Sequence, residues 1–380
     1  MARIDLDLAH SYKPNPQSDS DYALLPLKMC FEDGGAYALL GPSGCGKTSL
    51  LNIISGLVTP SQGSVKFDGV VMNAKTPQQR NIAQVFQFPV IYDTMTVAQN
   101  LAFPLRNRGV PADKIKQRVG KIAEMLELSG QLDVRAAGLA ADAKQKISLG
   151  RGLVREDVSA VLFDEPLTVI DPHLKWQLRR KLKQIHHELK LTLVYVTHDQ
   201  VEALTFAEQV VVMTRGRAVQ IGSASDLFER PQHTFVGHFI GSPGMNFLPA
   251  QRDGQQLVVA GCNVATTLAV PATVLAAAGR LVVGIRPEYV TLAAPNAPGA
   301  VPATVVQAQD VGTYWLVTAQ VGQGGPGEGR TTVVRARLSP DADIPAAGAA
   351  VWLAVVGAHT CFYADDVLIT ETPNAAEVVA

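Results

Sequence analysis

The chain has 380 residues, 47% of them hydrophobic and 18% charged, and a formal net charge of −1 at pH 7. This length allows two or three domains with a large core. The balanced charge excludes the basic surface that is typical of proteins that bind nucleic acid or anionic lipid, so we expect no nucleic-acid partner. The start lacks the apolar core of a signal peptide, no apolar run is long enough to cross a bilayer, and the four cysteines have no paired spacing. We therefore expect a chain with reduced thiols in the cytosol that does not itself span a membrane.

A glycine-rich run follows the apolar, strand-like residues 36–40 and precedes a helix-like segment. It reads Gly41, Pro42, Ser43, Gly44, Cys45, Gly46, Lys47 and Thr48, with Ser49 next. This is the pattern of a P-loop, in which backbone N–H groups turn inward around a polyphosphate. Lys47 then reaches the β- and γ-phosphates, and the Thr48 hydroxyl is placed to bind Mg²⁺. The run predicts nucleotide binding.

Apolar runs that resemble strands alternate with longer helical patterns up to about residue 240. The runs are 36–40, 82–85, 160–163, 192–196 and 210–213. This alternation predicts a doubly wound α/β core. Beyond residue 240 charge thins, and short β-rich segments are separated by turns rich in Gly, Pro and Ala. We expect a small all-β barrel domain there.

Two adjacent carboxylates, Asp164 and Glu165, follow the apolar run 160–163. Asp164 stands where a second contact to Mg²⁺ is needed, and Glu165 can orient or deprotonate the water that attacks the γ-phosphate. Taken alone, such a pair is more often a solvated turn, but its place after a P-loop favours hydrolysis of the nucleotide.

Another strand-like run ends at His198. Because the ends of parallel strands meet at one edge of a sheet, we expect this imidazole beside the same site. There it can hydrogen-bond the γ-phosphate or the attacking water and hold Glu165 in place.

Together with these motifs, three further stretches give the chain a resemblance to a known family. They are 84–87, 196–204 and 239–248, joined by the later run 284–288. The chain resembles the ATP-binding subunits of ATP-binding cassette (ABC) transporters, in particular the subfamily of the maltose and glycerol-phosphate importers. The resemblance implies an α/β P-loop NTPase core of RecA-like type over residues 1–240, with a helical subdomain near 88–158. It also implies an OB-type, TOBE-like regulatory domain over residues 241–380.

The resemblance assigns roles to two further residues. Gln87 would coordinate Mg²⁺ together with Thr48 and Asp164, position the attacking water and sense the membrane subunit. Tyr12 would stack on adenine, although the segment 14–20 lengthens the spacing and leaves Tyr22 as the alternative.

One motif departs from the family. Where the family has Leu-Ser-Gly-Gly-Gln, this chain has Leu139, Ala140, Ala141, Asp142 and Ala143. In the family this motif grips the γ-phosphate bound by the opposite subunit of a head-to-tail dimer. Ala140 removes the hydroxyl, and Asp142 adds a negative charge where a phosphate should lie. The sequence therefore predicts pairing with a second, different ATPase subunit, and the alternative is a homodimer that tolerates a drifted motif.

The resemblance thus implies an ATP-hydrolysing subunit of a bacterial importer, held peripherally on the cytoplasmic face of the inner membrane. Its partners would be two transmembrane permease subunits and, indirectly, a periplasmic solute-binding protein. Sugars or polyols, with glycerol or glycerol phosphate favoured, are the expected solutes. The alternatives are a soluble ABC ATPase without a transport role and a regulatory nucleotide-binding subunit with little turnover.

Overall fold

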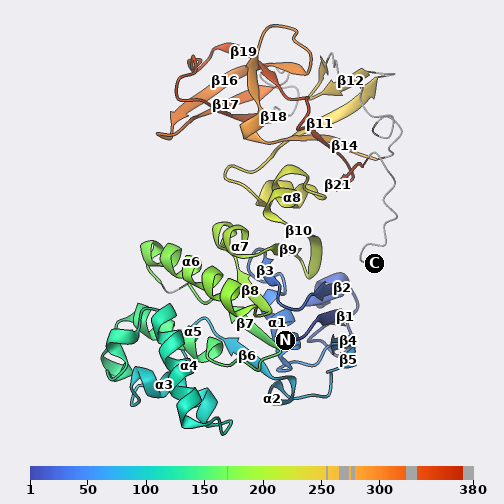
Figure 1. The fold of residues 1–380 in the computed structure, drawn as a ribbon. Coiled ribbons are helices and arrows are strands. Elements are labelled where there is room, and N and C mark those ends of the chain that lie inside the picture. Colours follow the sequence, from blue (N-terminus) through green and yellow to red (C-terminus); the bar gives the residue numbers. More distant parts are fainter. Residues whose placement is uncertain (169, 254–255, 265–273, 275–278, 322–331, 371–380) are drawn as a thin grey trace. The chain divides into compact units, whose positions relative to one another are not determined.

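The structure is a computed structural model that describes residues 1–168, 170–253, 256–264, 274, 279–321 and 332–370. Its contacts divide the chain into two compact units. The first unit comprises Met1–Ala224, and the second begins at Ser225. Each unit is described by itself below, with the element labels of Figure 1.

A mostly parallel sheet forms the centre of the first unit. Among the described residues its six strands lie in the order β10-β9-β3-β8-β7-β6. They are β3 (Ala36–Leu40), β6 (Ile82–Val85), β7 (Ala160–Asp164), β8 (Leu193–Thr197), β9 (Gln209–Thr214) and β10 (Arg217–Gly222). Only β10 pairs antiparallel, with β9. The carboxyl ends of the five parallel strands therefore meet at one edge, which is where α/β sheets place ligands.

Both faces of this sheet are buried, as the predicted doubly wound core requires. On β7, Val161 and Phe163 enter one apolar core, while Ala160 and Leu162 enter the other. Strands covered on both faces read as continuous apolar runs, which is why the sequence reveals them. The helices of this unit are α1 (Lys47–Ser55), α2 (Pro77–Arg80), α3 (Val97–Arg106), α4 (Ala112–Met125), α5 (Ala141–Leu153), α6 (Pro172–Leu189) and α7 (Gln200–Phe206), with short 3-10 helices η1 (Asp19–Asp21), η2 (Ser129–Gln131) and η3 (Ala136–Gly138).

A second, antiparallel sheet, which the sequence analysis did not identify, packs over α1. Its strands lie in the order β2-β1-β4-β5, and they are β1 (Ile4–His10), β2 (Leu24–Phe31), β4 (Gln62–Phe67) and β5 (Val70–Val71). Apolar side chains of β1, β2 and β4 share one core with α1 and with one face of the parallel sheet. Helix α1 is therefore fixed from both sides.

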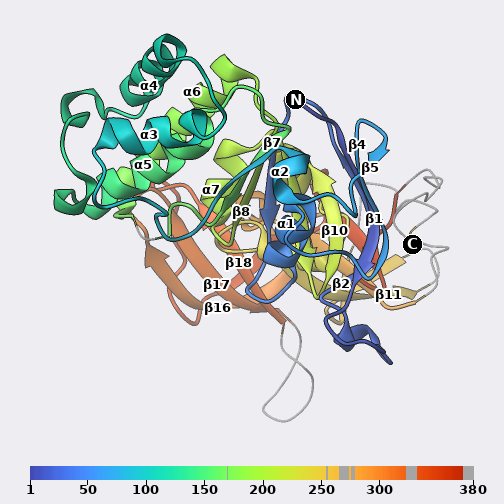
Figure 2. The ribbon, with the colours of Figure 1, turned by 90° about the horizontal axis from the view of Figure 1, so that it is seen from below.

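Helices α3, α4 and α5 form a cluster near β6. Figures 1 and 2 both place it on the other side of the first unit from β1, β2, β4 and β5. On α4, Ile115, Val119 and Ile122 are buried at the spacing of one helical face. Thr96 caps α3 by accepting from the backbone N–H of Gln99 at 3.2 Å. These three helices lie within the range 88–158 that the sequence analysis expected to form a helical subdomain.

The second unit is mainly β-structure, as predicted. It starts with α8 (Ala224–Glu229), which overlaps the boundary by one residue, and α9 (Thr234–Phe239), and it has the short 3-10 helix η4 (Pro287–Tyr289). One sheet of described residues has the order β13-β12-β11-β14-β20-β21 and another the order β15-β19-β16-β17-β18. These strands are β11 (Asn246–Asp253), β12 (Gln256–Val259), β13 (Cys262–Val264), β14 (Leu281–Ile285), β15 (Thr291–Ala293), β16 (Ala300–Asp310), β17 (Trp315–Val321), β18 (Thr332–Leu338), β19 (Ala350–Ala354), β20 (Cys361–Ala364) and β21 (Val367–Leu368).

A buried arginine joins the helices of this unit to its strands. Arg286 is 1% exposed, and its guanidinium donates to the carbonyls of Phe228 and Gly237, at 3.0 Å each, and lies over the Phe228 ring. The five N–H donors of a guanidinium can satisfy several backbone carbonyls at once. No helix in the described part of the chain has the length and apolarity needed to span a membrane.

Candidate nucleotide-binding site

The P-loop connects the end of β3 to the start of α1. Gly46, directly before α1, has φ 103°, a left-handed conformation that L side chains rarely adopt. A Cβ on Gly41 would lie 2.2 Å from the carbonyl oxygen of Met213 on β9, so no larger residue fits there. These two glycines let the loop turn tightly against the sheet and lead into the first turn of α1, and the backbone N–H groups at a helix N-terminus favour anions.

The Lys47 side chain lies inside this loop. It is 6% exposed, and its ammonium donates to the carbonyls of Gly41 at 2.8 Å and Pro42 at 3.0 Å. Its neighbour Cys45 is also buried, and burial raises the pKa of that thiol. A buried ammonium whose bonds go to neutral carbonyls gains further stabilisation from an anion. The loop therefore offers a phosphate both a positive charge and backbone donors.

Thr48 and Asp164 come together across 116 residues of sequence. The Thr48 hydroxyl donates to a carboxylate oxygen of Asp164 at 3.4 Å. Burial is the main cause that raises the pKa of Asp164, and the charge of Glu165 adds to it, while Thr48 and Lys47 oppose the shift. A partly desolvated carboxylate beside a hydroxyl is a pair of hard oxygen donors of the kind that Mg²⁺ prefers.

Glu165 faces His198 at the ends of neighbouring strands. His198 Nδ1 lies 3.1 Å from Glu165 Oε1, and the side chains are 54% and 22% exposed. Glu165 has φ 46°, an unusual conformation for a glutamate, and its N–H donates to the carbonyl of Val196 at 3.0 Å. Strained backbone of this kind persists only where the surrounding structure holds it, and it concentrates at functional sites.

Thr168 is a site neighbour that the sequence analysis did not assign. Its hydroxyl donates to the other carboxylate oxygen of Glu165, Oε2, at 3.3 Å. Glu165 is therefore held from two directions, by Thr168 and by His198. A threonine three residues after a carboxylate carries no signal of this contact, because the contact depends on how the chain turns after β7.

Of the two candidates for adenine stacking, Tyr12 lies beside α1. The hydroxyls of Tyr12 and Ser49 are hydrogen-bonded at 3.0 Å, and the Tyr12 ring is 65% exposed. The hydroxyl of Tyr22 instead accepts from Gln62 Nε2 on β4 at 3.4 Å. Tyr12 thus contacts the first turn of the helix that the P-loop begins, and Tyr22 contacts a strand of the antiparallel sheet.

Gln87 lies just beyond the end of β6, at the same edge of the sheet as Asp164. The residues that follow it are tied to α5: the N–H of Val90 donates to the Ser148 hydroxyl at 3.3 Å, and the Arg151 guanidinium stacks over the Tyr92 ring at 4.8 Å. The segment around Gln87 and helix α5 are therefore mechanically linked.

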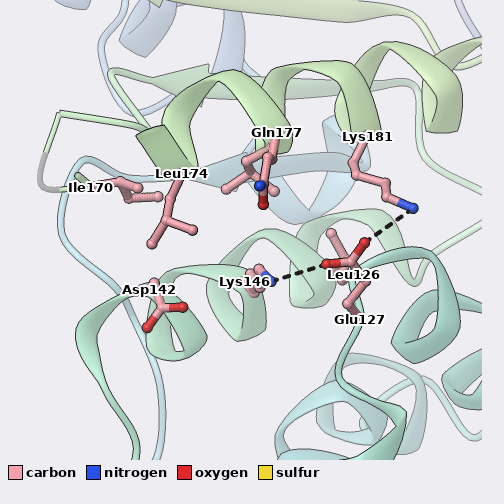
Figure 3. A pocket seen from close by; sticks show the side chains of 9 residues that line it. Leu126, Glu127, Asp142, Lys146, Ile170, Leu174, Gln177 and Lys181 are labelled. Atoms are coloured by element: carbon pink, nitrogen blue, oxygen red, sulfur yellow. Dashed lines mark ion pairs between the residues drawn. The ribbon is translucent and has the colours of Figure 1, made fainter. Parts of the chain in front are cut away.

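The residues 139–143 surround the start of α5. Ala140 is the N-cap residue and offers no side-chain hydrogen bond, while Asp142 lies in the first turn. Figure 3 shows Asp142 across a small pocket from Ile170 and Leu174, apart from the ion pairs of Glu127. A carboxylate in the first turn of a helix favours the helix dipole, so Asp142 partly replaces the missing cap.

Family models match three parts of the chain. The model described as "ABC transporter" matches residues 24–168, "MalK OB fold domain" matches 241–290 and "TOBE domain" matches 283–362. These matches identify the α/β P-loop core and the OB-type domain after it, and they confirm the predicted fold class.

Relatives extend the match over most of the chain. The sn-glycerol-3-phosphate import ATP-binding protein UgpC of Paraburkholderia xenovorans is 39% identical over 90% of this chain and 93% of its own length. The trehalose import ATP-binding protein SugC of Mycobacterium tuberculosis is 41% identical over 77% of this chain and 74% of its own.

A solved structure gives a third comparison. The structure of cbiO1 from Clostridium perfringens, described as part of the ABC transporter complex cbiONQ, has a TM-score of 0.54 and 26% identity, and it covers 60% of this chain and 90% of that one. None of these comparisons supports the predicted second, different ATPase subunit. The extent of the match with relatives shows that this chain belongs to the ATP-binding proteins of ABC transporters and is an ATPase.

Proposed function

We propose that this chain is the ATP-hydrolysing subunit of an ABC importer for a sugar or a glycerol-phosphate type solute. Relatives with 39% and 41% identity are named for the import of sn-glycerol 3-phosphate and of trehalose. In this role the chain binds two transmembrane permease subunits at the cytoplasmic face of the inner membrane. A periplasmic solute-binding protein delivers the solute to the permease and does not touch this chain.

Lys47 and the N–H groups of the P-loop hold the phosphates of ATP. Thr48, Asp164 and Gln87 would hold Mg²⁺, and the ion would supply positive charge that stabilises the phosphates during hydrolysis. The residues present fit this ion, since a hydroxyl and a carboxylate oxygen lie 3.4 Å apart beside the P-loop. No cluster of three His, Cys, Asp or Glu side chains in the described residues forms a metal cage. The single carboxylate of Asp164 with the Thr48 hydroxyl suits Mg²⁺, which proteins usually bind through one or two carboxylates and the substrate phosphates.

The pairing of Glu165 with His198 carries the proposal of hydrolysis. Glu165 accepts the proton of the attacking water through a carboxylate oxygen, and His198, 3.1 Å from Oε1, holds that carboxylate in place and donates to the γ-phosphate. Thr168 restrains the second carboxylate oxygen, so the water meets a base with a fixed orientation.

Tyr12 provides the platform for adenine in this proposal. Its contact with Ser49 places the exposed ring next to the helix that follows the P-loop. Stacking of a base on an aromatic ring needs this kind of exposed face near the phosphate site.

The segment after β6 is the proposed contact for the permease. Its apolar side chains are exposed, with Phe86 at 41%, Phe88 at 67% and Val90 at 52%. Exposed apolar side chains that follow one another in a loop are typical of a binding surface. Through Ser148 and Arg151 the same segment touches the second half of α5, so a movement of the permease would reach both Gln87 and this helix.

The second, different ATPase subunit has no support among the relatives, and Ala140 with Asp142 remains its only basis. Subunit counting decides the point: the tagged chain is purified with its permease partners, and the copies of each ATPase are counted by native mass spectrometry. Two copies of this chain would exclude the different subunit.

Glu165→Gln tests the proposed hydrolysis, and Glu188→Gln is the matched control because Glu188 is exposed on α6, outside the site. We expect Glu165→Gln to keep ATP affinity and to lose at least about a hundredfold in turnover, whereas the control keeps both. ATP binding is measured by calorimetry and turnover by phosphate release. Normal turnover in Glu165→Gln would show that Glu165 is not the base.

The solute class needs a cellular experiment. Cells that lack this chain are given labelled sn-glycerol 3-phosphate or labelled trehalose, and uptake is compared with that of cells complemented by the wild-type chain or by Glu165→Gln. Uptake that depends on the wild-type chain identifies the solute. Unchanged uptake of both compounds would contradict the proposed solute class while leaving the ATPase assignment intact.

A further inference from the structure

A buried carboxylate accepts a hydrogen bond from the residue that precedes His198. Glu202, on α7, is 4% exposed. Its Oε2 accepts from the Thr197 hydroxyl at 2.8 Å and from the Tyr195 hydroxyl at 3.0 Å, and its Oε1 lies 3.8 Å from Lys175 Nζ on α6. Burial of a carboxylate is costly, and these partners offset the cost.

The hydrogen bonds of the Thr197 hydroxyl fix the backbone on both sides of His198. The Thr197 hydroxyl donates to Glu202 and also accepts from the backbone N–H of Asp199 at 3.0 Å. It therefore joins the residue before His198 to the residue after it. Because a hydroxyl has a single hydrogen, donation to Glu202 leaves its lone pairs directed at Asp199.

Capping of α7 does not account for Glu202. The carboxylate of Asp199 caps this helix by accepting from the backbone N–H groups of Val201 at 2.8 Å and Glu202 at 3.1 Å. The Glu202 side chain is left to bind β8 and α6. It reaches one hydroxyl beside His198 and one ammonium on the helix that follows the turn containing Thr168.

We propose that Glu202 is a positioning residue for His198. By fixing the Thr197 hydroxyl it sets the turn from Thr197 to Asp199, and this turn aims the His198 ring at Glu165. The inference rests on the proposed function of Glu165 and His198. The negative charge of Glu202 strengthens its hydrogen bonds with Thr197 and Tyr195, since hydrogen bonds from hydroxyls to a carboxylate are stronger than those between neutral groups.

Thr197→Val and Tyr195→Phe form a matched pair that tests this inference. Each removes one hydroxyl from Glu202 Oε2 and keeps the shape of the side chain, and both residues are buried, at 2% and 0% exposure. Only Thr197 adjoins His198. We expect Thr197→Val to lower kcat at least about tenfold, with KM for ATP unchanged, and Tyr195→Phe to keep kcat within about twofold. Equal kcat in the two variants, reduced or unreduced, would overturn the inference.

A direct measurement of the His198 ring tests the inference even in variants that lose ATP turnover or part of their stability. In the full chain labelled with ¹³C-histidine, the ring signal of His198 is assigned by its absence in His198→Ala and then titrated with pH. We expect Thr197→Val and Glu202→Ala to move this signal or its titration midpoint, and Tyr195→Phe to leave both in place, because Tyr195 does not adjoin His198. An unmoved His198 signal in Thr197→Val would overturn the inference.

His198→Ala separates this inference from the proposed function on which it depends. If His198→Ala hydrolyses ATP at the wild-type rate, the proposed role of His198 fails and the positioning role fails with it. If His198→Ala loses turnover and Thr197→Val does not, only the positioning role fails. In the double variant we expect Thr197→Val to add no further loss to His198→Ala, because the two changes remove the same interaction. Additive losses would overturn the inference.

Discussion

The edge of the parallel sheet and the start of α5 both contain motifs that stand out in the sequence, but they differ in how their residues are bound. At the sheet edge, Thr48 bonds Asp164, and Glu165 bonds Thr168 and faces His198. At the start of α5, Ala140 has no capping side chain and Asp142 complements a helix end. The contacts that hold the side chains at the sheet edge lie within one chain and can be read from it. The action on a partner's nucleotide that the family resemblance implies for residues 139–143 cannot be read in this way, so their departure from the family pattern carries less weight.

The largest effect should follow loss of the P-loop ammonium. Lys47→Ala removes a buried positive charge whose hydrogen bonds go to two P-loop carbonyls and to the Cys45 thiol, and we expect ATP affinity to fall at least about a hundredfold. Lys146→Ala is the control, because Lys146 belongs to α5 and pairs with Glu127 at 3.7 Å. Calorimetry with ATP measures both. Equal affinities in the two variants would remove the distinction between the sheet edge and α5.

A smaller loss should separate the two tyrosines. Tyr12→Ala is expected to weaken ATP binding by about 1–3 kcal/mol, the range for stacking of a base on an aromatic ring. Tyr22→Ala should leave the affinity unchanged, because its hydroxyl bonds Gln62 away from α1. Fluorescent-nucleotide titration compares the variants. A loss in Tyr22→Ala alone would transfer the stacking role to Tyr22.

The same contrast explains what the sequence could predict. The P-loop and the strands of the parallel sheet are local patterns, and the ends of parallel strands meet by topology alone, so the meeting of Thr48 with Asp164 follows from the fold class. The antiparallel sheet was missed although Ile4, Leu6 and Leu8 alternate with two aspartates, a pattern typical of a half-buried strand.

Other features have no local signal. A glutamate does not encode a left-handed backbone, yet Glu165 has φ 46° because β7 and β8 fix the turn. The carboxylate of Glu202 is four residues from His198 in sequence, but its role depends on the side-chain directions of β8 and α6. The function that the family resemblance implies for residues 139–143 would involve a second polypeptide, which one sequence does not contain.

Restoring a cap should stabilise the start of α5. Ala140→Ser places a hydroxyl at the N-cap, and we expect the free energy of unfolding to rise by about 0.5–2 kcal/mol. Ala141→Ser is the control, because an exposed serine inside the first turn caps nothing. Urea unfolding measures both variants. If Ala140→Ser gained no more than Ala141→Ser, the cap would already be replaced in full by Asp142.

Asp164 and Asp142 offer a test with opposite signs. Because the pKa of native Asp164 is raised above its ordinary value of 3.8, the native state binds more protons than the unfolded state between these two pKa values. The free energy of unfolding therefore falls as the pH rises from 3.8 through the native pKa. Asp164→Asn removes the charge that is costly to bury. Without nucleotide, we expect a higher melting temperature than wild type at pH 8 and a difference that shrinks as the pH is lowered toward 3.8. A lower melting temperature at pH 8 would contradict the burial cost.

Asp142→Asn should act in the reverse direction and by the smallest amount. The carboxylate of Asp142 lies in the first turn of α5, where a negative charge favours the helix dipole, so its loss should cost about 0.3–1 kcal/mol at low ionic strength. Salt screens such an interaction, and the cost should shrink in 1 M NaCl, where the screening length is only about 3 Å. Thermal melting of Asp142→Asn and wild type at both salt concentrations measures this. A stabilising effect of Asp142→Asn would mean that the carboxylate destabilises the isolated chain, in addition to repelling a bound phosphate. The case for a motif adapted to a different partner subunit would then become stronger.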